Sequence, residues 1–153
     1  MTIVPESSAA FQKADEGLRC DVMNEHEKKE IYLKLQTINQ ITTASFFEFD
    51  ANGNPTTESA KFDGLRLTRL VGTASPHTVI VSGTLIQETA LSVYDDKALL
   101  LKEVPVTLSF NARTNMQGDL TKPSEKKGKK NKVLEVDKLA TITNCESLDQ
   151  ESL

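Results

Sequence analysis

Alternation of apolar and polar residues with a period of two recurs along most of the chain, and this pattern limits the possible folds more than any other feature. Residues 62–71 alternate through Leu65 and Leu67, and residues 78–93 form a longer run that is rich in β-branched side chains. Successive side chains of a strand point to opposite faces of a sheet, so such runs are typical of strands buried on one face. We therefore expect a chain built mainly from β-strands.

Clusters of turn-forming residues separate these runs. Residues 50–55 read Asp-Ala-Asn-Gly-Asn-Pro, a composition that favours a hairpin turn. Residues 72–76 and 95–97 end later runs in the same way. Strand-like runs separated by turns at intervals of about 8–12 residues are typical of all-β domains. We therefore expect an all-β fold of about 6–8 antiparallel strands, either a single small barrel like that of oligonucleotide-binding domains or a β-sandwich.

Residues 31–41 fit two patterns. Ile31, Leu33 and Leu35 alternate as in a strand, whereas Ile31, Leu35 and Ile38 also lie on one face of a helix. Residues 37–43 are mostly β-branched, and such side chains lose rotamer freedom in a helix. The composition therefore favours a strand, with a helix as the alternative.

Two residues within later runs predict irregular strands. Gly83 interrupts residues 78–93 and indicates a bulge or a bend. Pro105 has no backbone N–H to donate, so it predicts that residues 99–111 include an edge strand or a bulge.

The length of 153 residues allows one core, since domains contain roughly 100–200 residues. We expect a β-rich core over residues 30–144, a flexible or short-helical segment over residues 1–29, and an acidic tail over residues 145–153. Both termini are polar and are expected to be partly disordered. No run reaches the roughly 18 consecutive apolar residues of a membrane span, and the first 17 residues lack the apolar centre of a signal peptide. We therefore expect a cytoplasmic protein that does not bind membranes.

The two cysteines, Cys20 and Cys145, lie near opposite ends of the chain. In the chain-entropy model a disulfide between them would add roughly 4–5 kcal/mol to stability. A reducing compartment would keep both residues as thiols, and nothing in the sequence marks secretion. The sequence therefore favours two free thiols, with the disulfide as the alternative.

Motifs for catalysis and metal binding are missing from the sequence. Residues 50–54 begin like a calcium loop, but the sixth and twelfth positions hold Pro55 and Lys61 where an EF-hand needs Gly and Glu. The chain has two histidines, His26 and His77, and neither has the close-paired spacing of zinc ligands. We therefore expect no enzymatic activity, no metal and no cofactor.

Positive charge is concentrated in residues 122–132, with the sequence KPSEKKGKKNK, which we call the lysine tract. It holds six of the 18 basic residues and one acid, so it carries +5, and the other 142 residues must carry −9 to give the net charge of −4. A solvated loop that keeps a strand edge from aggregating is one interpretation. The other is a loop whose lysines contact the phosphates of a polyanion.

The second interpretation predicts a non-catalytic module that binds single-stranded nucleic acid. Oligonucleotide-binding barrels combine basic loops with aromatic side chains on which bases stack. Among Phe46, Phe47 and Phe49, Phe47 is expected to face away from the other two; burial in the core is the alternative for each aromatic residue. The candidate nucleic-acid-binding residues are Lys122, Lys126, Lys127, Lys129, Lys130, Lys132, Phe47 and Phe110.

Residues 145–153, with the sequence CESLDQESL, combine acidic residues with two leucines. This segment resembles the acidic, hydrophobic-tipped tails of bacterial single-stranded DNA-binding proteins. The resemblance implies a hook for partner proteins or a competitor for the lysine tract. A frayed acidic tail is the alternative.

The alternative function also fits an all-β chain that lacks catalytic motifs. The protein would then be a structural or assembly component, for example of a phage or another particle, and would act through protein–protein contacts. Such a role predicts a homo-oligomer.

Overall fold

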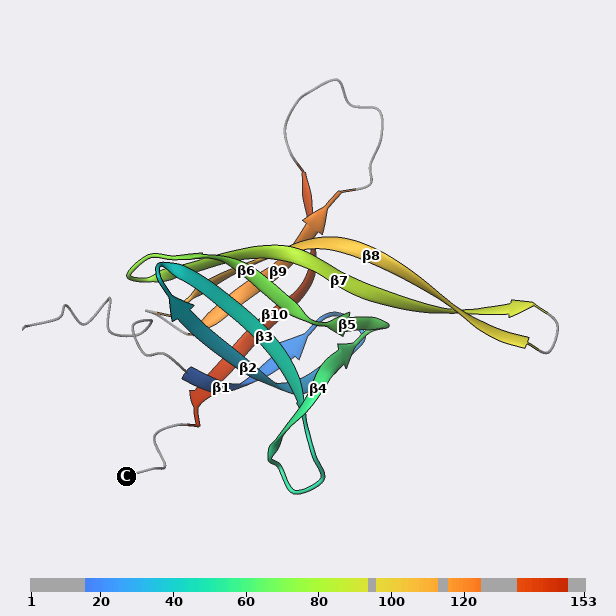
Figure 1. Cartoon of the computed structure of the whole chain (residues 1–153), viewed down its shortest axis with the longest axis horizontal. Coiled ribbons are helices and arrows are strands. Elements are labelled where there is room, and N and C mark those ends of the chain that lie inside the picture. Colours follow the sequence, from blue (N-terminus) through green and yellow to red (C-terminus); the bar gives the residue numbers. More distant parts are fainter. Residues whose placement is uncertain (1–15, 94–95, 113–115, 125–134, 149–153) are drawn as a thin grey trace, which may run out of the picture.

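A computed structural model describes residues 16–93, 96–112, 116–124 and 135–148, and this part of the chain is all-β. It contains no helix, and so none long and apolar enough to cross a membrane. The strands of the described residues form one antiparallel sheet (Figure 1). They are β1 (Glu16–Met23), β2 (Lys28–Ile38), β3 (Ile41–Phe49), β4 (Pro55–Phe62), β5 (Leu65–Leu67), β6 (Arg69–Ala74), β7 (Thr78–Val93), β8 (Asp96–Asn111), β9 (Gln117–Pro123) and β10 (Val136–Ser147).

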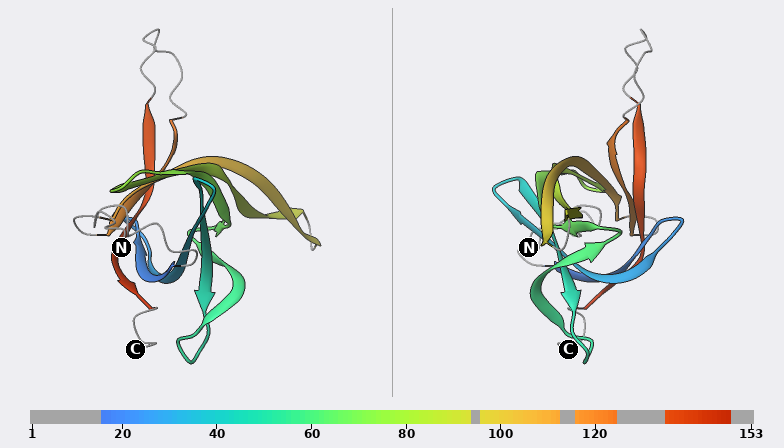
Figure 2. Two further views of the ribbon diagram at one scale, coloured as in Figure 1. Left: turned by 60° about the vertical axis from the view of Figure 1, so that its left-hand side comes forward. Right: turned by 90° about the vertical axis from the view of Figure 1, so that its right-hand side faces the viewer.

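The pairings between strands follow a closed circuit. Strands β1, β2 and β3 pair in chain order, β3 pairs with β6, and β6 to β10 again pair in chain order. The circuit closes because β10 pairs with β1. Strands β4 and β5 provide a second connection from β3 to β7. Figure 2 shows the first and last strands side by side on one flank of the molecule.

Ten strands exceed the expected six to eight. The N-terminal segment, expected to lie outside the core, contributes β1, in which Leu18 and Val22 are buried. The run at residues 62–71 is divided among the end of β4, all of β5 and the start of β6. Between β5 and β6 lies Thr68, whose hydroxyl donates a 3.1 Å hydrogen bond to the carbonyl of Thr84 on β7. The last strand also reaches Ser147, inside the segment expected to be an acidic tail.

Residues 31–41 form strands, which confirms the favoured interpretation. They belong to β2 and the start of β3, joined by a turn at Asn39 and Gln40. Both turn residues have positive φ, 51° and 69°, as in the type I′ turns that match the twist of a hairpin. The turn expected at residues 50–55 is also confirmed, because one carboxylate oxygen of Asp50 accepts 2.9 Å hydrogen bonds from the backbone N–H groups of Asn52 and Asn54.

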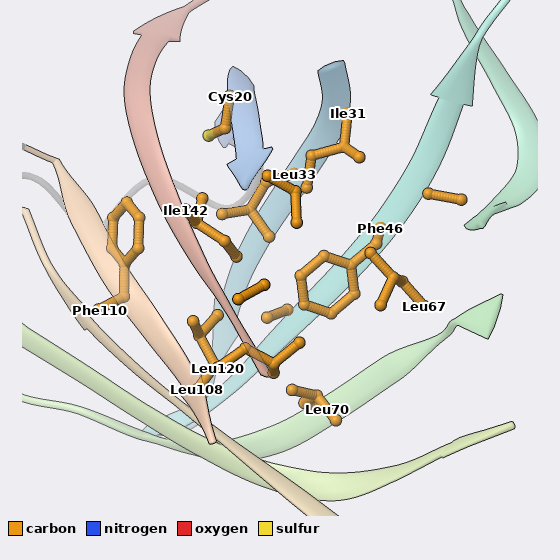
Figure 3. Close-up of a cluster of buried hydrophobic side chains, with 14 of the residues drawn as sticks. Cys20, Ile31, Leu33, Phe46, Leu67, Leu70, Leu108, Phe110, Leu120 and Ile142 are labelled. Atoms are coloured by element: carbon orange, nitrogen blue, oxygen red, sulfur yellow. The ribbon is translucent and has the colours of Figure 1, made fainter. Parts of the chain in front are cut away.

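The core lies within the circuit of strands, where alternate residues point inward (Figure 3). Its buried residues come from the first and the last described strands as well as from those between them. Its largest fully buried side chains are Phe46, Phe62, Phe110, Leu18, Ile31, Leu33, Leu67, Leu70, Leu85, Leu108, Leu120 and Ile142.

A disulfide joins Cys20 on β1 to Cys145 on β10, so the expectation of two free thiols is wrong. The sequence argument rested on compartment alone, whereas the topology makes β1 and β10 neighbours and brings the two Cα atoms to 4.1 Å. Disulfides are typical of oxidising environments. The bond therefore differs from what the expected reducing, cytoplasmic setting predicts.

Of the bulge or bend expected at Gly83, the bulge is absent from the β7–β8 ladder, because these two strands keep one register from end to end. The glycine is needed for close packing instead. A Cβ atom at this position would lie 2.9 Å from the Leu70 side chain and 3.3 Å from the carbonyl oxygen of Arg69. Only a residue without a side chain lets β6 approach β7 this closely.

Candidate interaction surface

Among the residues expected to bind nucleic acid, Phe110 lies in the core and not on the surface. Its side chain is 0 % exposed, so no base can stack on it. Alternation along β8 places Phe110 on the inward face with Leu108, and Gly118 opposes it on β9. A Cβ at Gly118 would lie 2.9 Å from the Phe110 Cα, so the two strands are tightly packed here. Phe110 is a core residue.

Phe47 lies on the outer side of the sheet and is half-buried in an aromatic cluster. The rings of Phe47 and Phe49 both contact Tyr32, with centroids 6.0 and 6.2 Å away. Phe47 and Phe49 therefore share a side, and the expectation that Phe47 faces away from both its neighbours is wrong. The Arg19 guanidinium lies 4.5 Å from the centroid of the Phe49 ring and donates a 2.8 Å hydrogen bond to the Gly53 carbonyl. The cluster attaches the β3–β4 turn to β1 and β2.

The lysine tract begins on β9, which pairs with β10. Lys122 lies on β9, is half-buried and opposes Asp137 on β10. The Ser124 N–H donates a 2.9 Å hydrogen bond to the carbonyl of Glu135, which extends the pairing of β9 with β10 by one contact. The remaining candidate lysines fall outside the described residues; they are Lys126, Lys127, Lys129, Lys130 and Lys132.

An open groove of about 760 Å³ runs beside the β1–β2 turn and β10. Polar groups at this groove already have hydrogen-bond partners within the protein. Asn24 donates to the Asp63 carboxylate at 3.0 Å, and the Asp63 N–H donates to the Glu27 carboxylate at 2.8 Å. The described residues contain no group of three or more His, Cys, Asp or Glu side chains able to hold a metal ion. Nothing in this groove marks a reactive group.

The most unusual surface is the far half of the β7–β8 hairpin. We call residues 88–93 of β7 and 96–101 of β8 the arm. These two segments pair with one another, and Figure 1 shows them reaching well beyond the other strands. Among the described residues, β9 pairs with β8 only from Thr107 onward, and β5 pairs with β7 only up to Gln87. The arm is therefore a two-stranded ribbon.

Three consecutive leucines of the arm are exposed to solvent: Leu99 by 65 %, Leu100 by 49 % and Leu101 by 61 %. Because side chains alternate along a strand, Leu99 and Leu101 share one face and Leu100 lies on the other. Leu100 continues the row that points into the core at Val106 and Leu108, but the arm has no core beneath it. Each face of the ribbon thus carries at least one leucine that is open to solvent.

The base of the arm is fastened to the rest of the molecule by charged residues. The Glu88 carboxylate pairs with the guanidinium of Arg66 on β5 and lies 3.6 Å from the Lys61 ammonium on β4. The Glu88 N–H donates a 3.1 Å hydrogen bond to the carbonyl of Gly64. These contacts fix the direction in which the arm leaves the sheet.

Sequence reasoning missed this surface. A continuous apolar run such as Leu99, Leu100 and Leu101 is typical of a strand buried on both faces, and only the missing neighbours of the arm reveal that it is exposed. The signal in the sequence is Pro105, which predicted an edge, and β8 does have an open edge beside it. A comparison of the chain with family models, curated proteins and solved structures finds no match.

Proposed function

We propose that this protein is a non-catalytic structural component that assembles with copies of itself through the arm. The observation that carries the proposal is the exposure of Leu99, Leu100 and Leu101 on a ribbon that projects from the sheet. An isolated two-stranded ribbon is only marginally stable in water, and exposed apolar patches mark interaction sites. A partner that covers the leucines would remove both penalties.

The circuit of pairings supports a further part of the proposal, that the body of the molecule is a small closed barrel. Every strand of the circuit has a neighbour on each side along part of its length. Closure reduces free edges in the body, whereas among the described residues the arm and the adjoining part of β8 before Thr107 keep an open strand edge. The body would act as the rigid support and the arm as the contact element.

Size-exclusion chromatography with light scattering tests this function. The wild-type protein should form an oligomer at micromolar concentration, and the double variant Leu99→Lys, Leu101→Lys should elute as a monomer with an unchanged circular dichroism spectrum. Val136→Lys is the matched control, because Val136 is also an exposed apolar residue but lies on β10, outside the arm. A wild-type protein that stays monomeric at every concentration would refute the proposal.

Binding of single-stranded nucleic acid by the lysine tract is the second candidate function. It is supported by the charge of +5 within eleven residues and by the paired strands from which the tract leaves. The test is fluorescence anisotropy of a labelled oligonucleotide at two salt concentrations. The logarithm of the affinity should fall with the logarithm of the salt concentration, with a slope of roughly −0.7 for each phosphate contact. Replacement by Glu should abolish binding when it is made at Lys126, Lys127, Lys129 and Lys130. If the anisotropy of the oligonucleotide does not change when wild-type protein is added at low salt, this function is excluded.

A further inference from the structure

We propose that two copies of the chain join by antiparallel pairing of their β8 strands, in one defined register centred on Leu100. The inference rests on the proposed function and specifies how the arm makes its contact. The resulting four-stranded sheet would run from β7 through both β8 strands to the β7 strand of the second copy. The partner is thus a second molecule of this chain, related to the first by a twofold axis.

The direction of the backbone groups follows from hydrogen bonds at the base of the arm. The Glu88 N–H donates to Gly64 and so points away from β8. Two residues that oppose one another in an antiparallel pair either both point their N–H groups toward the other strand or both point them away from it. Leu101 opposes Glu88, so the N–H of Leu101 points away from β7. This alternation holds along the whole strand because the β7–β8 register has no shift.

Four residues of β8 therefore present backbone N–H and C=O groups on the open edge: Lys97, Leu99, Leu101 and Glu103. Two residues further on, Pro105 occupies the next outward position and has no N–H to donate. From Thr107 onward the same edge is paired with β9. The open segment thus has defined ends. On the opposite edge of the arm, two residues of β7, Ala90 and Ser92, present backbone N–H groups to solvent. The outward N–H of Glu88 already donates to the Gly64 carbonyl.

The sequence of the open segment, Lys-Ala-Leu-Leu-Leu-Lys-Glu, complements itself in an antiparallel arrangement. With Leu100 opposite its own copy, Leu99 opposes Leu101 of the second copy, and Lys97 opposes its Glu103. Opposite charges in such positions stabilise a sheet and like charges destabilise it. A shift of two residues along the partner strand would place Leu101 opposite Lys97 in one direction and Leu99 opposite Glu103 in the other, so a leucine would face a charged residue in either case. The pattern therefore selects one register.

The chosen register also covers the exposed leucines. Leu99 and Leu101 of both copies gather on one face of the joined sheet, and the two Leu100 side chains meet on the other. Each outward residue donates one backbone hydrogen bond and accepts one, so the open edge becomes fully paired. Burial of the leucine side chains removes apolar surface from water, which adds to the stabilisation from the ladder of hydrogen bonds.

Disulfide trapping tests the register. Residues facing one another at a non-hydrogen-bonded position have Cα atoms about 4.5 Å apart, within the range of a disulfide. Leu100→Cys should therefore form a covalent dimer rapidly on mild oxidation, seen on a non-reducing gel. The matched control is Lys102→Cys on the same face, because its two copies would lie roughly 14 Å apart along the strands. The chain's own cysteines are bonded to one another and do not compete.

A backbone variant separates edge pairing from contact by side chains alone. Leu101→Pro removes an outward N–H without breaking the β7–β8 ladder, as Pro105 already does, whereas Leu101→Ala keeps that N–H. The dimer dissociation constant should be about tenfold or more higher for the proline variant than for the alanine variant.

The outcomes distinguish this inference from the proposed function. The register is established if Leu100→Cys is trapped selectively as a covalent dimer and the dimer dissociation constant of Leu101→Pro is raised. Equal trapping of both cysteine variants, or an oligomer that Leu101→Pro leaves intact, overturns edge pairing and leaves assembly standing. A wild-type protein that is monomeric at all concentrations overturns both.

Discussion

Cys20 and Cys145 are joined across β1 and β10, with Cα atoms 4.1 Å apart although 125 residues separate them in the sequence. The bond ties the first described strand to the last and closes nearly the whole chain into one loop. In the chain-entropy model such a cross-link stabilises the fold by roughly 4–5 kcal/mol.

We therefore expect Cys145→Ala to lower the free energy of unfolding by about 4 kcal/mol, measured by urea denaturation. Dithiothreitol should destabilise the wild-type protein by a similar amount and leave the variant unaffected. An equal effect of dithiothreitol on both proteins would show that the disulfide does not form in solution.

Phe110→Ala should cost about 3–5 kcal/mol of stability, because it empties a fully buried position that closely packed strands surround. Phe47→Ala should cost less, since that ring is only half-buried. Thermal unfolding of the two variants measures the difference. A Phe110 variant as stable as wild type would contradict its place in the core.

Arg19→Lys should loosen the β3–β4 turn, because lysine cannot both stack on Phe49 and donate to the Gly53 carbonyl as arginine does. We expect a loss of about 1 kcal/mol in local stability, seen as faster amide exchange of Gly53. Arg69→Lys is the control, because Arg69 is exposed and lies far from this turn. Equal exchange at Gly53 in both variants would refute the role of Arg19.

The hydrogen bond from Lys29, at 2.7 Å, holds the pKa of Glu48 below its ordinary value of 4.5, against a smaller opposing effect of desolvation. The folded state thus favours the carboxylate, so this pair stabilises the protein above pH 4.5 and the contribution is lost as pH falls through the lowered pKa. Glu48→Gln should therefore reduce stability at pH 7 by up to about 1 kcal/mol and by nothing in strong acid. A stability difference that persists in strong acid would contradict the ion pair.

Local patterns were sufficient to predict some elements and not others. The alternation in residues 78–93 and the cluster at Asp50 to Pro55 predicted β7 and the β3–β4 turn correctly, because both depend on neighbouring residues. The turn at Asn39 and Gln40 was missed, since it contains neither glycine nor proline. Residues before 30 were expected to lie outside the core, because their own sequence gives no clear strand pattern. One strand that pairs with β1 is the adjacent β2, but the other, β10, comes from the far end of the described chain.

The position of the candidate interface could not be predicted from local sequence, because it depends on which strands pair with β8. No local pattern distinguishes Leu99, Leu100 and Leu101 from a buried strand, and Phe110 was expected to be available for stacking when it belongs to the core. What decides both cases is which strands lie alongside β8: β9 covers its last residues and leaves the leucines uncovered.

Assembly through the arm is tested most directly by amide exchange of individual β8 residues at low and high protein concentration, followed by nuclear magnetic resonance. The account predicts that the outward N–H groups of Leu99 and Leu101 exchange more slowly as concentration rises. The N–H of Thr107, which already faces β9, should serve as an unchanged reference. Exchange at Leu99 and Leu101 that is independent of concentration would contradict assembly through this edge.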